Sequence, residues 1–140
     1  MISLCRIPLS RLASAVLLFP LLAAKCPPDH SGTVIVFEFR DETHAELRVA
    51  VTDPETVAAA RAFLAGIDKR HIPIGRIEPG AGVDSRYPFH YRSDEVRVAE
   101  MAVEVCDGRI MRTPQEVQAF IAGSGGRYCP WKAYPKAIEP

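Results

Sequence analysis

The chain has 140 residues, and its 17 basic and 17 acidic side chains give a formal net charge of zero. The first 24 residues contain two arginines and no acidic residue, so the rest of the chain has 15 basic and 17 acidic side chains, a net charge of −2. This balance gives no electrostatic attraction for nucleic acid, and we expect no nucleic-acid partner. The remaining length fits one domain, residues 33–140, with a single core.

The first 24 residues have the pattern of a signal peptide. Two arginines precede an apolar run over residues 12–24, which is shorter than the ~20 apolar residues of a membrane-spanning helix. We therefore expect cleavage near residue 24, a secreted or periplasmic protein, and a flexible connection over residues 25–32. The alternatives are an uncleaved membrane anchor and a lipid on Cys26, although the basic residue before this cysteine is unfavourable for lipidation.

Residue usage indicates a bacterial protein. The sequence contains no Asn, and its 13 Arg far outnumber its 4 Lys, as is typical of GC-rich bacterial genomes. Without Asn, the chain has no site for N-linked glycosylation.

Three of the four cysteines follow the signal segment, namely Cys26, Cys106 and Cys129. An odd number in an oxidising compartment predicts one disulfide and one spare thiol, and we predict that Cys106 pairs with Cys129. In the chain-entropy model, closing a loop of this length stabilises the fold by about 3 kcal/mol. The alternative is a pair of buried free thiols. The spare Cys26 could link two chains or tether the start of the domain.

Alternating apolar residues predict an antiparallel hairpin at the start of the domain. Residues 33–40 and 45–51 place an apolar side chain at every second position, and the polar residues 41–44 can form the loop between them. The side chains expected to face the core are Ile35, Phe37 and Phe39 on the first strand and Leu47, Val49 and Val51 on the second.

A helix is predicted after the hairpin. Thr52 or Asp53 can accept hydrogen bonds from the first free amides, and Pro54 lacks the amide hydrogen that would otherwise be unpaired there. We expect Gly66 to end the helix in a left-handed conformation. The apolar stripe expected to lie across the hairpin consists of Val57, Ala60 and Leu64.

Three further strands are predicted between residues 71 and 106. The first spans residues 71–77, where Pro73 requires an edge position or a bulge. A glycine-rich loop at 79–84, which we expect to be mobile, leads to a short strand at 87–92. The last strand is predicted at 101–106, with Met101, Val103 and Val105 on the core side.

A second helix is predicted from a capping box. Thr113 is the cap, Pro114 occupies the first turn, and Glu116 can bond back to the cap amide. The residues expected to form its buried stripe are Val117, Phe120 and Ile121, and Gly123 is expected to end it. Strands and helices do not alternate as in a parallel sheet, so we predict an α+β fold, a small mostly antiparallel sheet packed against two helices, with one disulfide.

Several short segments support a family resemblance. They are Asp53-Pro54-Glu55, His71 with Gly75-Arg76-Ile77, Phe89-His90, Glu104 to Gly108, and Gly126 to Trp131. From about residue 34 to residue 134 the chain resembles the amino-terminal domain family of a calmodulin-binding protein, which has many secreted bacterial members of uncharacterised function. Calmodulin itself is not an expected partner, because its targets are usually basic amphipathic helices and neither predicted helix is basic.

The candidate ligand-binding residues are His71, His90, Asp107 and Trp131. The two histidines could converge across adjacent strands and form, with Asp107, a metal or acid–base site; hydrogen-bonded structural histidines are the alternative. Asp107 also fits a turn in which Gly108 supplies the positive φ. Trp131 is expected to be a core anchor beside the disulfide, or alternatively an exposed binding residue. No metal-type spacing or nucleophile motif occurs, so no catalytic residue, metal or cofactor is assigned.

Two functions fit these observations. We favour a secreted or periplasmic binding module, such as an inhibitor, that presents the loops at 79–88 and 123–127 to a protein or small ligand. The alternative is a small hydrolase or metal-binding protein that uses His71, His90 and Asp107. A structural role in the cell envelope also fits, and no sequence feature separates it from the other two.

Overall fold

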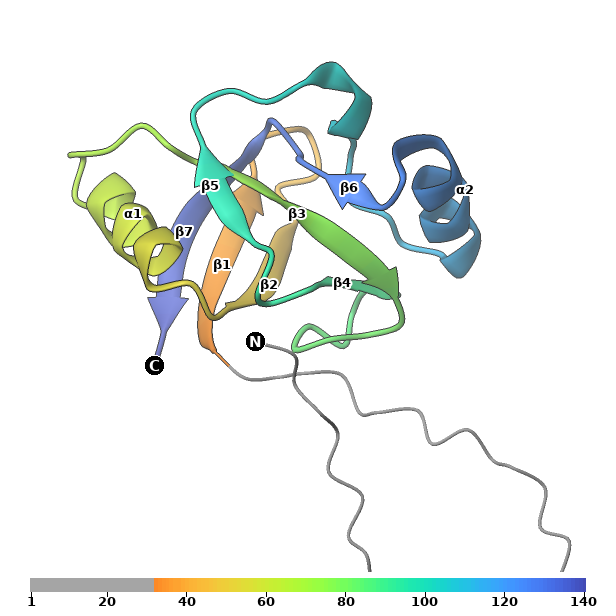
Figure 1. Cartoon of the computed structure of the whole chain (residues 1–140), viewed down its shortest axis with the longest axis horizontal. Helices are drawn as coiled ribbons and strands as arrows, with labels where there is room; N and C mark the ends of the chain where they lie inside the picture. Colours follow the sequence, from red (N-terminus) through yellow and green to blue (C-terminus); the bar gives the residue numbers. More distant parts are fainter. Residues whose placement is uncertain (1–31) are drawn as a thin grey trace, which may run out of the picture.

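The computed structural model describes residues 32–140, which form two antiparallel sheets and two helices (Figure 1). The predicted signal segment and most of the connecting segment at 25–32 lie outside the described residues. Within residues 32–140, no helix is both long enough and apolar enough to cross a bilayer. The architecture confirms the predicted α+β class.

The first sheet has the strand order β2-β1-β7. Strands β1 (Thr33–Phe39) and β2 (Glu46–Val51) form the predicted hairpin, in which Ile35 lies opposite Val49. The predicted inward-facing side chains of both strands are buried. The sequence analysis assigned no structure to the end of the chain, but Ala133–Glu139 forms β7 and pairs with the other side of β1.

The second sheet is built around β3, which pairs with three short strands at different points along its length. Their bounds are Ile72–Pro79 for β3, Phe89–Tyr91 for β4, Arg97–Ala99 for β5 and Arg127–Tyr128 for β6. Pro73 pairs with Val98 of β5, whereas β6 pairs only with Gly75 and Arg76. Among the described residues, Pro73 therefore has a strand on one side only, as its missing amide hydrogen requires.

Helix α1 (Pro54–Leu64) begins as predicted. The Asp53 side chain accepts a hydrogen bond from the backbone N of Thr56 at 2.9 Å, and Pro54 occupies the first turn. The predicted stripe is only partly right, because the buried residues are Thr56, Ala59 and Ala60, while the Leu64 side chain is exposed. The helix is rotated so that Thr56 Oγ1 lies 3.2 Å from the carbonyl oxygen of Val96, just before β5. Gly66 follows the helix with φ +74°, as predicted.

The predicted strand at 101–106 is wrong. Residues 101–103 are irregular, and Glu104–Cys106 forms a short 3₁₀ helix, η1. The start of β3 is already paired with β5, which buries Val98 against the core in place of the apolar residues that follow. Alternation of apolar residues alone could not show that this edge of β3 was occupied.

Helix α2 (Pro114–Ser124) has the predicted capping box. The Thr113 side chain accepts from the backbone N of Glu116, and the Glu116 carboxylate accepts from the backbone N of Thr113 at 2.9 Å. Val117 is fully buried, whereas the other two predicted stripe residues are half-buried. The helix continues past Gly123 and ends at Gly125, whose φ of +67° gives the left-handed cap.

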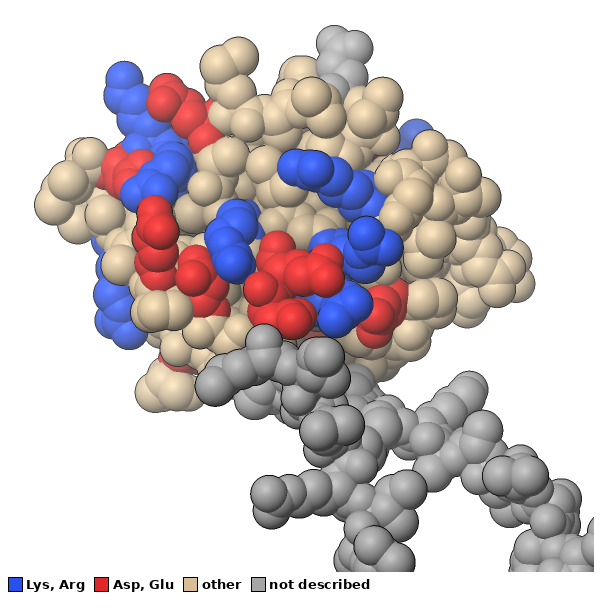
Figure 2. Space-filling model, viewed as in Figure 1, with Lys and Arg blue, Asp and Glu red and all other residues tan. Residues whose placement is uncertain are grey.

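A single large apolar cluster fills the space between the two sheets and the helices. Tyr128 is at its centre and is fully buried, with its ring edge-on to Phe89 and Phe120. Its hydroxyl lies 3.1 Å from the carbonyl oxygen of Arg109, and burial raises the pKa of this phenol well above its usual value. On the face shown in Figure 2, acidic and basic side chains are interspersed, as expected for a chain without net charge.

Candidate functional site at the disulfide

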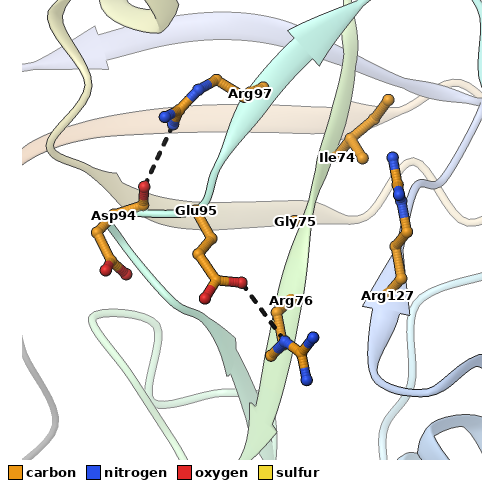
Figure 3. A pocket seen from close by; sticks show the side chains of 7 residues that line it. All are labelled: Ile74, Gly75, Arg76, Asp94, Glu95, Arg97 and Arg127. Atoms are coloured by element: carbon orange, nitrogen blue, oxygen red, sulfur yellow. Dashed lines mark hydrogen bonds and ion pairs between the residues drawn. The ribbon is translucent and has the colours of Figure 1, made fainter.

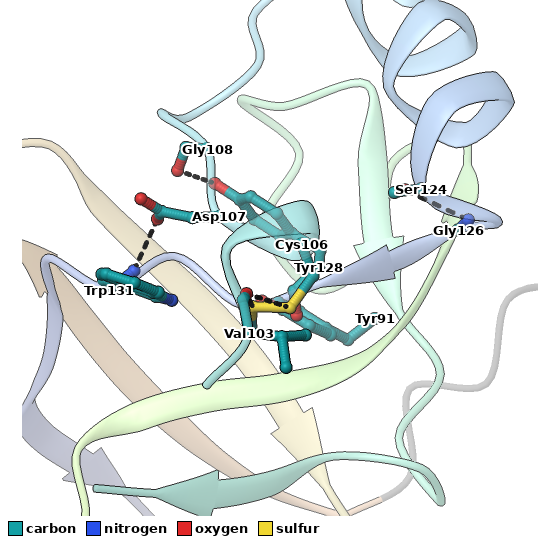
Figure 4. The surroundings of a disulfide bond; sticks show 10 residues. Tyr91, Val103, Cys106, Asp107, Gly108, Ser124, Gly126, Tyr128 and Trp131 are labelled. Carbon is teal, nitrogen blue, oxygen red and sulfur yellow. Dashed lines mark hydrogen bonds between the residues drawn. A yellow bond between two sulfur atoms is a disulfide. The ribbon is translucent and has the colours of Figure 1, made fainter. Parts of the chain in front are cut away.

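The predicted disulfide is present and holds η1 against the end of β6. The Cα atoms of Cys106 and Cys129 are 5.1 Å apart, and both side chains are buried (Figure 4). The backbone N of Cys129 also donates to the carbonyl oxygen of Cys106 at 2.7 Å. The segment before Cys106 is therefore fixed to the body of the domain by a covalent bond and a hydrogen bond.

This fixed segment exposes three large apolar side chains to solvent. Met101 is 84% exposed, Val103 61% and Val105 77%. Only two other large apolar side chains of residues 32–140, Leu64 and Ile67, are exposed to a comparable degree. We call Met101, Val103 and Val105 the apolar strip. Exposed apolar residues that cluster in this way, on a backbone held in place, are typical of interaction surfaces.

A hollow of about 220 Å³ adjoins the apolar strip. Its lining residues are His71, Ile72, Glu100, Met101, Ala102, Trp131 and Tyr134. Met101 thus belongs to both features, so the strip and the hollow form one continuous surface. The hollow combines aromatic and apolar walls with one histidine and one carboxylate, a mixture common in ligand-binding sites.

His71 is held in a fixed orientation in this hollow. Its ring stacks on Tyr134 with centroids 3.9 Å apart and an interplanar angle of 6°. The guanidinium of Arg40 lies 3.9 Å from the same Tyr134 centroid, so both groups contact the phenol ring. His71 Nδ1 lies 3.0 Å from the carbonyl oxygen of Ala133, which can only accept, so Nδ1 carries a hydrogen. In the neutral ring, Nε2 is then the acceptor.

Trp131 packs half-buried beside the disulfide. Its backbone N donates to Asp107 Oδ1 at 2.8 Å (Figure 4). Its indole Nε1 is buried and has no hydrogen-bond partner among the described residues. Asp107 therefore orients the turn that carries Trp131.

Gly108 differs from the prediction, because it has no positive φ. A Cβ atom at this position would lie 3.1 Å from the ring of Phe120, so the glycine is required by close packing. Asp107 likewise bonds across 24 residues to Trp131 instead of to neighbouring amides. The turn interpretation of these two residues was thus correct about neither the backbone conformation nor the bonding.

The structure brings together only two of the four candidate ligand-binding residues. His71 and Trp131 share the hollow. His90 lies opposite Glu78 at the other end of β3, about 20 Å from His71 along an extended strand. Its Nδ1 lies 2.8 Å from the carbonyl oxygen of Gly80. Asp107 does not line the hollow, and residues 32–140 contain no group of three side chains placed to bind a metal ion.

The loop after β3, proposed above as a binding loop, is fastened to β2. Asp84 is only 4% exposed and accepts a hydrogen bond from the backbone N of Arg48 at 3.0 Å. The Tyr87 hydroxyl donates to the carbonyl oxygen of Glu46 at 2.9 Å. These bonds hold the second half of the loop against the first sheet.

Sequence reasoning missed the apolar strip and the contribution of β7 to the hollow. The strip residues were recognised, but their alternation was interpreted as a buried strand. Tyr134 was not considered, because the segment from Ala133 was treated as a tail. The local signal for β7 is weak, since Pro135 and Lys136 interrupt its apolar pattern.

Comparison with known families gives one finding. The family model for the N-terminal domain of a calmodulin-binding protein matches residues 33–139, almost all of the described chain. Neither the comparison with curated proteins nor the comparison with solved structures gives a match.

Proposed function

This chain belongs to the N-terminal domain family of a calmodulin-binding protein, and on that premise we propose that it is a secreted or periplasmic binding module. The proposal rests on the apolar strip, whose three side chains are exposed on a backbone that the disulfide holds in place. A surface that is already ordered loses little conformational entropy when a partner binds, so more of the contact energy remains as affinity.

We propose that the partner is a protein with an apolar surface that covers the strip and inserts a side chain into the adjoining hollow. Aromatic residues on one side and aliphatic residues on the other are the composition expected at the centre of such an interface. The strip replaces the loop at 79–88 as the proposed contact, because that loop makes its hydrogen bonds to β2.

Two observations support an exported protein. The residues at the start of the chain have the signal-peptide pattern, and a structural disulfide is stable in an oxidising compartment. We do not propose calmodulin as the partner of this chain, whatever the name of its family. Helix α1 carries a single basic residue, Arg61, and α2 carries none, whereas calmodulin targets are usually basic helices.

Affinity capture with three matched baits tests this proposal. The oxidised domain, a Val105→Ser variant and an Ile67→Ser variant are each incubated with periplasmic and culture-fluid proteins of the source organism. Ile67 is 82% exposed and lies outside the strip, so it controls for the general loss of an exposed apolar side chain. We expect a partner at comparable stoichiometry on the wild-type and Ile67→Ser baits and its loss from Val105→Ser. Equal retention on all three baits would exclude the strip, and no partner on any bait would contradict the binding function.

A further inference from the structure

A second hollow, separate from the apolar strip, lies between β5, β3 and β6. It has a volume of about 460 Å³ and lies on the outer side of β3 (Figure 3). Its lining residues are Ile74, Gly75, Arg76, Asp94, Glu95, Arg97 and Arg127. Three arginines and two carboxylates thus surround a small apolar floor.

Two of these arginines face each other across neighbouring strands. Arg76 of β3 and Arg127 of β6 are directly opposite in the antiparallel register, so their side chains leave the same face of the sheet. Like charges at directly opposed positions repel each other and destabilise a sheet. This arrangement becomes favourable when an anion lies between the two guanidinium groups.

The carboxylates around the hollow already have other partners. Glu95 lies 3.5 Å from Arg76 Nε and 3.4 Å from Arg92 Nη1. Asp94 Oδ1 lies 3.7 Å from Arg92 Nε. These carboxylates therefore share the charge of Arg92, which does not line the hollow, and do not neutralise all of its arginines.

The charge left uncompensated belongs to Arg127. Arg97 lies 3.7 Å from Asp53 and donates to the carbonyl oxygen of Val96 at 2.8 Å. The Arg127 guanidinium, in contrast, makes no ion pair or side-chain hydrogen bond with any residue of the described part of the chain. In Figure 3 it extends along the hollow beside Ile74, with no dashed line to another residue.

We propose that this hollow binds the oxyanion of a small ligand, a phosphate, sulfate or carboxylate group, between Arg127 and Arg76. The planar guanidinium offers parallel N–H donors that match two oxygens of such a group. The anion would pair with the free charge of Arg127 and remove the repulsion between the two arginines. Ile74 can contact an apolar part of the same ligand. This site is independent of the apolar strip and of the function proposed for it.

Titration of the oxidised protein with inorganic phosphate, sulfate and acetate, followed by amide NMR shifts, tests the proposal. We expect saturable shifts at residues 75, 76 and 127 with at least one of these anions, and the preferred anion identifies which oxyanion the site accepts. Arg127→Gln should weaken this binding by about tenfold, because it removes a charged donor pair. Arg109→Gln, which removes an exposed arginine outside the hollow, should leave it unchanged. Non-saturable shifts spread over many arginines, or equal weakening in both variants, would overturn the proposal.

Discussion

The chain contains two similar Asp-x-Arg turns that differ in one long-range hydrogen bond, and this difference can be measured. In each turn the aspartate accepts from the backbone N and the guanidinium of the arginine two residues later, at Asp84–Arg86 and at Asp68–Arg70. Only Asp84 also accepts from a distant backbone amide, that of Arg48 on β2, at 3.0 Å. We expect Asp84→Ala to destabilise the domain considerably more than Asp68→Ala.

The magnitude follows from the groups left without partners. A hydrogen bond from a buried amide to a charged acceptor contributes about 1.5–3 kcal/mol. The Arg86 side chain is 54% exposed and can turn to water, so loss of its ion pair adds about 1 kcal/mol or less. We therefore expect Asp84→Ala to lower the free energy of unfolding by about 2–4 kcal/mol. Urea denaturation of both variants at pH 7, with the disulfide intact, measures the difference. Equal losses in the two variants would refute the role of the bond to β2.

The same carboxylate predicts a pH dependence. Burial raises the pKa of Asp84, but hydrogen bonds from Arg86 and from the Arg48 backbone outweigh it, so the pKa is lowered from 3.8 in the folded state. A group whose pKa is lower in the folded state stabilises the fold above its unfolded pKa, and this stabilisation is lost as the pH falls through the folded value. Asp84→Asn should therefore flatten the loss of stability below about pH 4. An unchanged acid limb would contradict this assignment.

Three further predictions test other parts of the structure by urea denaturation. Replacing Cys106 and Cys129 together by Ala should lower the free energy of unfolding by about 3 kcal/mol, and an unchanged value would show that the disulfide does not constrain the unfolded chain. Thr113→Ala should cost about 1 kcal/mol through loss of the capping bond, and no loss would mean that solvent caps α2 equally well. Val105→Thr should change stability by less than about 0.5 kcal/mol, whereas Val98→Thr should cost about 1–3 kcal/mol. The reverse order would restore the buried strand that the sequence predicted at 101–106.

Signals carried by neighbouring residues predicted much of the fold. The hairpin of β1 and β2 follows from a period of two over adjacent segments, and the start of α2 follows from Thr113, Pro114 and Glu116 within one turn. Both features depend on contacts between residues close in the chain. The Cys106–Cys129 pair was also predicted, because only three cysteines follow the signal segment and the pairing possibilities are few.

The candidate site was predicted less well. His71 and Trp131 do share a hollow, but His90 lies at the far end of β3 and Asp107 orients the Trp131 backbone. Which histidines meet depends on where β3, β4 and β7 lie in space. A sequence states which residues are chemically able to form a site, but not the distance between strands that are remote in the chain.

By itself, the sequence determined the α+β class, the hairpin, the helix caps, the disulfide and the family resemblance, because each depends on local pattern or on a small set of alternatives. Only the tertiary structure decided that β7 completes the first sheet and that β5 occupies the edge of β3. With that edge paired, the segment at 101–105 does not join the sheet, and its alternating apolar residues face solvent. The same residues that would be a core strand in another pairing are therefore a surface here, since burial depends on which long-range pairings occupy the edges of a sheet.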